Sequence, residues 1–141
     1  SFENIVETFS NFLAELWKVH PFREGNTRTV VTFCSMFIEA QGFYIESDLF
    51  KDNAAYMRSA LVAANAIFDD LGDLRKPEYL YRIVQDALEQ GRELKEHTAE
   101  AIRESGLQDT EERIRQVILW SRKEKRDPLP EEIREKILGS E

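Results

Sequence analysis

The stretch that decides the fold is residues 2–40, which read FENIVETFSNFLAELWKVHPFREGNTRTVVTFCSMFIEA. In its first part, the apolar side chains recur at the i, i+3, i+4, i+7 spacing of one face of an amphipathic helix. They are Phe2, Ile5, Val6, Phe9, Phe12, Leu13, Leu16 and Trp17. This helix must end near Val19 and His20, because the residue before Pro21 is pushed out of the α region. Residues 20–25 then form a loop.

A second helix follows this loop, and its apolar side chains cover almost its whole circumference. Asn26 and Thr27 are good capping residues for its start, and Gly42 is a good stop for its end. A helix that is apolar on all sides is usually buried at the centre of its domain. We therefore expect a buried central helix over about residues 27–40.

The rest of the chain also predicts helices. One is expected over 52–70, followed by a turn at Gly72 and Asp73, and the next runs from Pro77 through Leu88. Residues 1–75 contain 17 charged side chains, 6 basic and 11 acidic, whereas residues 76–141 contain 29, 13 basic and 16 acidic. This shift predicts a core over 1–90 and a charged helical extension over 91–141. No segment alternates with period two, so the fold is all-α.

Two further helices are expected in the charged extension. One starts at Asp109 and Thr110 with Glu112 as the capping-box partner, and the other starts at Pro130. Apolar residues in the first of them, from Ile114 to Trp120, either pack on the core, which we favour, or drive oligomerisation.

The composition limits the partners and the compartment. The net charge of −8 argues against general binding to nucleic acid or to an anionic membrane, although a local anion site needs only a few donors. Cys34 is the only cysteine, which suits a reducing compartment, and no apolar run approaches the ~20 residues of a transmembrane helix. We expect a cytoplasmic protein.

The loop and the start of the second helix combine groups that could transfer a phosphate-containing group. A glycine before a helix start lets a ligand approach the backbone, and the free N–H groups of the first turn bind phosphate well. Arg28 can add donors to the same anion, and Glu24 can hold Mg²⁺. His20, of a residue type with an unperturbed pKa near ~6.5, can act as a general base.

This stretch, His20-Pro21-Phe22-Arg23-Glu24-Gly25-Asn26-Thr27-Arg28, resembles the motif of the Fic (filamentation induced by cAMP) domain family. The family pattern is His-x-Phe-x-(Asp/Glu)-Gly-Asn-Gly-Arg-x-x-Arg, and six positions match with the correct spacing: His20, Phe22, Glu24, Gly25, Asn26 and Arg28. The resemblance covers residues 1–90 and implies the C-terminal part of a Fic helical bundle.

The resemblance implies a protein adenylyltransferase, an enzyme that moves AMP from ATP to a Ser, Thr or Tyr hydroxyl of a protein substrate. His20 would take the proton of that hydroxyl, and Glu24 would hold the Mg²⁺ that bridges the phosphates. Gly25, Asn26 and Thr27 would form the anion hole, and Arg28 would hold a distal phosphate. Phe22 would anchor the loop.

The sequence departs from the family pattern at two positions. Thr27 replaces the second glycine, and Val31 stands where the final arginine is expected. In the family, that arginine contacts the γ-phosphate, so the donor nucleotide stays open, as does transfer of phosphate in the manner of the Doc branch. The alternative from a different functional class is a binding or scaffold protein that has the Fic fold but no catalytic activity.

Two features of the family are missing from the sequence. Nineteen residues precede His20, too few for the β-hairpin flap and the lead-in helix together, so we expect the flap on a further segment or on a partner. The inhibitory pattern Ser/Thr-x-x-x-Glu-Gly/Asn is not present in these residues, so they do not encode self-inhibition. A homo-oligomer and an inhibitory partner both stay open.

Overall fold

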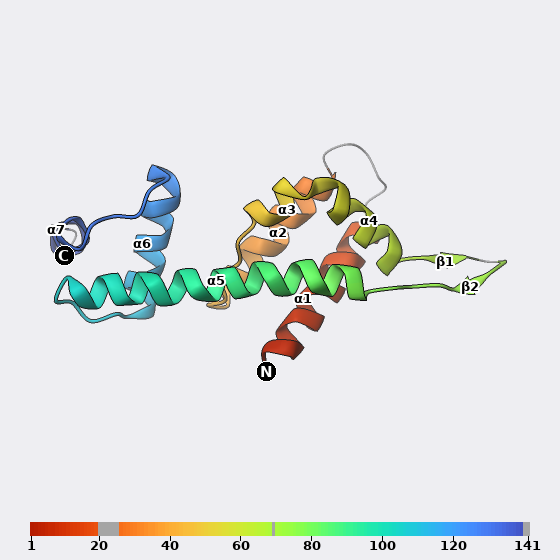
Figure 1. Cartoon of the computed structure of the whole chain (residues 1–141), viewed down its shortest axis with the longest axis horizontal. Coiled ribbons are helices and arrows are strands. Elements are labelled where there is room, and N and C mark those ends of the chain that lie inside the picture. Colours follow the sequence, from red (N-terminus) through yellow and green to blue (C-terminus); the bar gives the residue numbers. More distant parts are fainter. Residues whose placement is uncertain (20–25, 69, 140–141) are drawn as a thin grey trace. The chain divides into compact units, whose positions relative to one another are not determined.

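The computed structural model describes residues 1–19, 26–68 and 70–139, and this part of the chain is built almost entirely from helices (Figure 1). The helices are α1 (Phe2–Val19), α2 (Asn26–Ala40), α3 (Asp48–Asp52), α4 (Ala54–Ala64), α5 (Glu78–Glu104), α6 (Glu111–Glu124) and α7 (Pro130–Gly139). The prediction of an all-α fold is confirmed. The chain divides into two compact units, Ser1–Gly91 and Arg92–Glu141, and α5 contributes residues to both.

The core of the first unit lies among α1, α2, α4 and the first part of α5. The stripe predicted on α1 is confirmed, because Val6, Phe9, Leu13 and Trp17 are buried. They pack with buried side chains of the other elements, namely Val30, Val31, Cys34, Ile45, Phe50, Met57, Ala60, Leu61, Leu80, Ile83, Val84, Ala87 and Leu88. α1 ends at Val19, as the proline two residues later requires.

The second helix buries one face and exposes the other. Val30, Val31 and Cys34 point into the core, whereas Phe33, Met36 and Phe37 are between 51% and 68% exposed. The expectation of a helix buried on all sides is therefore correct for one face only. Phe37 stacks on Phe12 of α1 with ring centroids 5.3 Å apart, and this contact covers part of the outer face.

The chain leaves α2 through a tight turn and then runs along α5. Gly42 has a φ of 90°, and its N–H donates to the carbonyl of Glu39, so the predicted stop at this glycine is confirmed. The backbone N–H of Glu46 donates to the carbonyl of Ala87 at 3.0 Å. This bond connects the segment between α2 and α3 to α5.

The helix expected over 52–70 is wrong in both of its boundaries. Asn53, with φ −120° and ψ 41°, separates α3 from α4, and α4 already ends at Ala64. The Asn65 side chain donates to the carbonyls of Ala14 and Leu61, and these bonds hold the chain at the helix end. Residues beyond it form a short antiparallel hairpin, β1 (Ile67–Phe68) with β2 (Gly72–Asp73), where we expected helix and turn.

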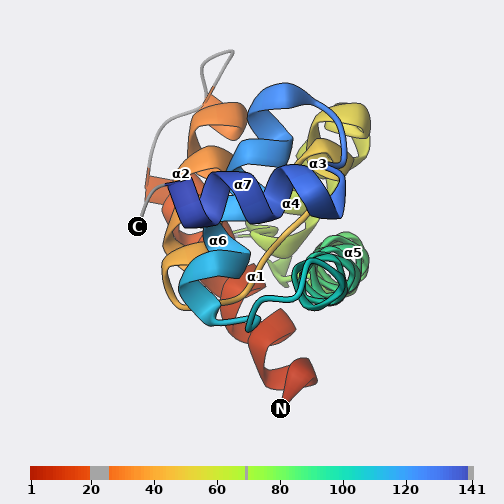
Figure 2. The ribbon, with the colours of Figure 1, turned by 90° about the vertical axis from the view of Figure 1, so that its left-hand side faces the viewer.

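The second unit consists of the end of α5, α6 and α7. The helix predicted from Pro77 through Leu88 is α5, which continues to Glu104, and Gly106, with a φ of 84°, follows its end. Thr110 caps α6 by accepting from Arg113 N–H, but its own N–H donates to the Gln108 carbonyl, not to Glu112. The start of α7 at Pro130 is as predicted, and Figure 2 shows α7 lying across α6.

The unit contains its own set of buried side chains, among them Ile102, Ile114, Val117, Ile118, Ile133 and Ile137. None of the helices in the described part of the chain combines the length and the apolar character that a membrane span requires.

Candidate functional site

The predicted active-site loop falls between α1 and α2. His20, Phe22, Glu24 and Gly25 lie outside the described residues. The backbones of Asn26 and Thr27 form the start of α2, while their side chains also lie outside what the structure describes. Arg28 is the one predicted site residue whose side chain is described, and it is exposed in the first turn of α2.

Arg28 lines a cavity of about 420 Å³ in the first unit. The walls come from α2, α3, the residue before α3, and α4. The lining side chains are Arg28, Val31, Thr32, Ser47, Asp48, Phe50, Lys51, Ala54, Met57 and Arg58. This volume lies in the range of small-ligand pockets, which is about 300–1,000 Å³.

The cavity has a positive rim. Arg28, Lys51 and Arg58 are exposed cations, and Asp48 is the carboxylate among the lining residues. None of the three cations forms an ion pair with a carboxylate of the described residues. The arrangement therefore favours an anion with several charges.

The floor of the cavity is apolar. Val31, Phe50 and Met57 are 7%, 3% and 1% exposed, and all three belong to the core of the unit. A low-polarity floor beneath charged groups strengthens their attraction for an anion, because water screens the interaction less there. Val31, one of the two positions at which the sequence departs from the family pattern, lies in this floor.

Lys51 and Arg58 were missed by the reasoning from sequence. They are the only basic residues between Glu39 and Asp73, in a stretch that also contains Glu46, Asp48 and Asp52. Two basic residues in an otherwise acidic stretch are a signal of a candidate anion site, but nothing in their spacing shows that they approach Arg28. The break between α3 and α4 at Asn53 turns both side chains toward one cavity.

Cys34 has no role as a nucleophile in this site. Its thiol is fully buried in the core, and burial raises its pKa to about 12. The thiol is therefore protonated at neutral pH, and only the thiolate is strongly nucleophilic. Among residues 1–19, 26–68 and 70–139, no three His, Cys, Asp or Glu side chains gather as metal ligands.

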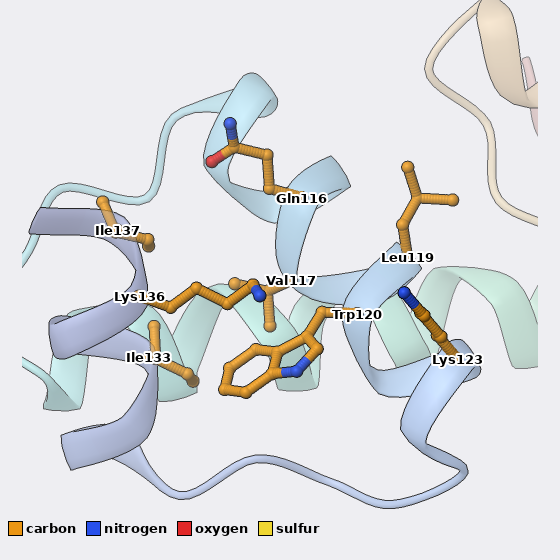
Figure 3. A pocket seen from close by; sticks show the side chains of 8 residues that line it. All are labelled: Gln116, Val117, Leu119, Trp120, Lys123, Ile133, Lys136 and Ile137. Atoms are coloured by element: carbon orange, nitrogen blue, oxygen red, sulfur yellow. The ribbon is translucent and has the colours of Figure 1, made fainter. Parts of the chain in front are cut away.

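Another cavity, of about 340 Å³, lies in the second unit (Figure 3). Trp120 of α6 and Ile133 and Ile137 of α7 line it, and the ammonium group of Lys136 lies 4.8 Å from the centre of the Trp120 ring. Its lining is mostly apolar, and it contains no residue of the predicted catalytic set.

A comparison with protein families finds a match to the model of the Fic/DOC family over residues 1–38. The matched segment contains α1, the predicted loop and most of α2. It includes Arg28, Val31 and Thr32 of the cavity lining. No curated protein and no solved structure matches the chain.

Proposed function

We propose, from the match of residues 1–38 to the Fic/DOC family model, that the protein transfers AMP from a Mg²⁺-bound nucleotide to a hydroxyl of another protein. The observation that carries the proposal is the family match over the loop His20–Arg28, together with the cationic cavity that Arg28 lines. A positive cavity next to a helix start suits the phosphate chain of a nucleotide.

In the proposed reaction, His20 accepts the proton of a Ser, Thr or Tyr hydroxyl on the substrate protein. A bond forms between the hydroxyl oxygen and the α-phosphorus of the nucleotide. The bond from that phosphorus to the bridging oxygen breaks, and pyrophosphate leaves with the electron pair. Positioning and charge stabilisation, more than covalent chemistry by the protein, accelerate such a step.

The remaining residues position the nucleotide. The backbone N–H groups of Gly25, Asn26 and Thr27 would bind a phosphate at the start of α2, and Arg28 would hold a distal phosphate. Glu24 would provide a hard oxygen ligand for Mg²⁺, which, when bound, neutralises charge on the phosphate oxygens. ATP is the proposed donor, and the cytoplasm is the proposed compartment.

The test is to incubate the protein with Mg²⁺ and each of ATP, GTP, CTP and UTP and to measure its intact mass, since transferases of this kind can label themselves. We expect a gain of one nucleoside monophosphate with ATP, and no gain in His20→Ala. The same gain in His20→Ala would contradict the role of His20. The absence of any gain with every nucleotide and an added protein mixture would contradict the proposal.

A second candidate, which Val31 leaves open, is transfer of a phosphate group in the manner of the Doc branch. Without an arginine at this position, the terminal phosphate is held by fewer groups of the motif itself. In this reaction the hydroxyl oxygen attacks the γ-phosphorus and a nucleoside diphosphate leaves. A phosphate-sized gain in mass would identify it.

An inactive scaffold is the third reading, and nucleotide binding distinguishes it. A nucleotide that binds the folded protein raises its melting temperature, because it stabilises only the state that it binds. We expect ATP with Mg²⁺ to do so in the wild-type protein and not in Asn26→Asp, whose carboxylate would repel a phosphate at the start of α2.

A further inference from the structure

The basic residues of the first 75 positions are concentrated at the cavity beside Arg28. This segment contains 6 basic and 11 acidic side chains, which gives a net charge of 6 − 11 = −5. Three of the six basic residues, Arg28, Lys51 and Arg58, nevertheless line this one cavity, against one carboxylate, Asp48. The net charge of the lining residues is therefore 3 − 1 = +2. A patch with the average composition of residues 1–75 would carry a negative net charge.

The three cations come from three different helices, and their positions follow from helix geometry. Arg28 shares one face of α2 with Val31 and Thr32, at the spacing i, i+3, i+4. Lys51 follows Asp48 by three residues on α3, and Arg58 follows Ala54 by four on α4. Each helix therefore turns one face toward the cavity, and each face carries one cation.

Three cations line this cavity with a single carboxylate, Asp48, and like charges repel one another. Val31, Phe50 and Met57 form its apolar floor, and the described residues supply no ion pair to any of the three cations. A bound anion would remove the repulsion. The geometry thus points to a ligand with more than one negative charge.

We infer that Arg58 and Lys51 bind the terminal phosphates of the nucleotide, and that they supply the positive charge that Val31 cannot. This inference rests on the proposed function, because Arg28 is the residue that connects the cavity to the predicted loop. Arg58 can give a phosphate two parallel hydrogen bonds, and Lys51 adds a point charge. The last motif position is then replaced by residues about 20 to 27 positions farther along the chain, on α3 and α4.

A phosphate chain fits the cavity better than an acidic peptide does. Arg28 lies in the first turn of α2, where the positive end of the helix dipole attracts an anion. Arg28 lines the same cavity as two further cations, Lys51 and Arg58, so a phosphate chain held by Arg28 has both of them on the walls of its pocket.

The test measures binding of ATP, AMP and inorganic tripolyphosphate to the full chain by calorimetry. We expect Arg58→Gln to lower the affinity for ATP and for tripolyphosphate about 10-fold or more, and Lys51→Gln to lower both affinities by a smaller factor. AMP lacks the terminal phosphates and should bind the variants as it binds the wild-type protein. Arg82→Gln is the matched control, since Arg82 is an exposed cation of α5 that does not line the cavity.

The outcomes separate this inference from the proposed function. Wild-type affinity for ATP in the double variant Arg58→Gln/Lys51→Gln overturns the inference, and so does an equal loss for AMP and ATP. Self-labelling with an unchanged KM for ATP in that variant overturns the inference while the proposed function stands. A loss of tripolyphosphate binding in Arg58→Gln, in a protein that transfers no group, supports the inference and rejects the proposed function. Both exposed side chains can be replaced without loss of the fold, which circular dichroism checks.

Discussion

Gly91 lies in α5 where the backbone of Tyr44 and Ile45 passes the helix at close range. A Cβ atom added to Gly91 would lie 1.9 Å from the carbonyl oxygen of Tyr44 and 2.7 Å from the backbone nitrogen of Ile45. These neighbours are backbone atoms, and the nearby bond from Glu46 N–H to Ala87 holds them in place. The absence of a side chain at this residue therefore allows the segment before α3 to dock on α5.

We predict that Gly91→Ala lowers the free energy of unfolding by about 2–3 kcal/mol, because the segment at Tyr44 must move away from α5. The measurement is urea unfolding followed by tryptophan fluorescence in a Trp120→Phe background, in which Trp17 is the remaining tryptophan. Gly139→Ala is the control, since a Cβ at Gly139 meets nothing within 4 Å. A Gly91→Ala protein as stable as Gly139→Ala would show that the contact is not tight.

At the scale of elements, the start of α7 is held by one carboxylate. Glu132 accepts two hydrogen bonds from the Arg126 guanidinium, at 2.9 and 2.6 Å, and a third from the backbone N–H of Leu129 at 3.1 Å. The hydrogen bonds from Arg126 come first among the causes that lower the pKa of Glu132 from 4.5 to about 2. The carboxylate thus links the end of the α6 turn to the first turn of α7.

This link gives a pH dependence with a definite sign. A carboxyl whose pKa is lower in the folded state stabilises the fold above its unfolded pKa and loses that contribution as the pH falls. The stability difference between the wild-type protein and Glu132→Gln should be constant above pH 4.5 and should vanish as the pH falls toward about 2.

The measurement is unfolding by urea, which carries no charge and does not screen the ion pair, at several pH values. Glu131→Gln, one position away, is the control, because Glu131 accepts no hydrogen bond from Arg126. A difference for Glu132→Gln that does not change between pH 7 and pH 2 would contradict the assignment. The link is exposed to solvent, so high salt should also weaken it.

At the scale of the whole molecule, the two units have separate buried side chains and one tryptophan each. Trp17 lies in the core of the first unit, and Trp120 lies in α6 of the second. The core cluster that contains Trp17 is built from residues that precede Gly91. In Trp17→Phe the remaining tryptophan is Trp120, and in Trp120→Phe it is Trp17. We predict that the fluorescence of these two variants gives different midpoint concentrations of guanidinium for unfolding.

The reason for this prediction is that each unit has its own group of buried side chains. The denaturant concentration at which one group loses its contacts therefore need not match that of the other, although α5 runs through both units. Gly91→Ala, introduced into both single-tryptophan proteins, should shift the Trp17 midpoint more than the Trp120 midpoint. Coincident midpoints that shift together would show one cooperative unit.

The sequence by itself determined the elements whose signals are local. Pro21 fixed the end of α1, Gly42 the end of α2 and Pro130 the start of α7, because each residue acts through its own backbone. The regular apolar stripe of α1 predicted its buried face in the same way. The motif His20–Arg28 also belongs to this class, since its residues are neighbours in the chain and match a family model without reference to the rest of the fold.

Only the tertiary structure decided what depends on partners far apart in the chain. The two bonds from Asn65, one of them to Ala14 of α1, accompany the end of α4 at Ala64 in a segment whose composition predicts continued helix. The outer face of α2 is as apolar as its inner face, so no pattern could show that Phe33, Met36 and Phe37 stay exposed. Lys51 and Arg58 meet Arg28 at one cavity because the break at Asn53 orients α3 and α4, and such an approach arises from packing that no local sequence signal encodes.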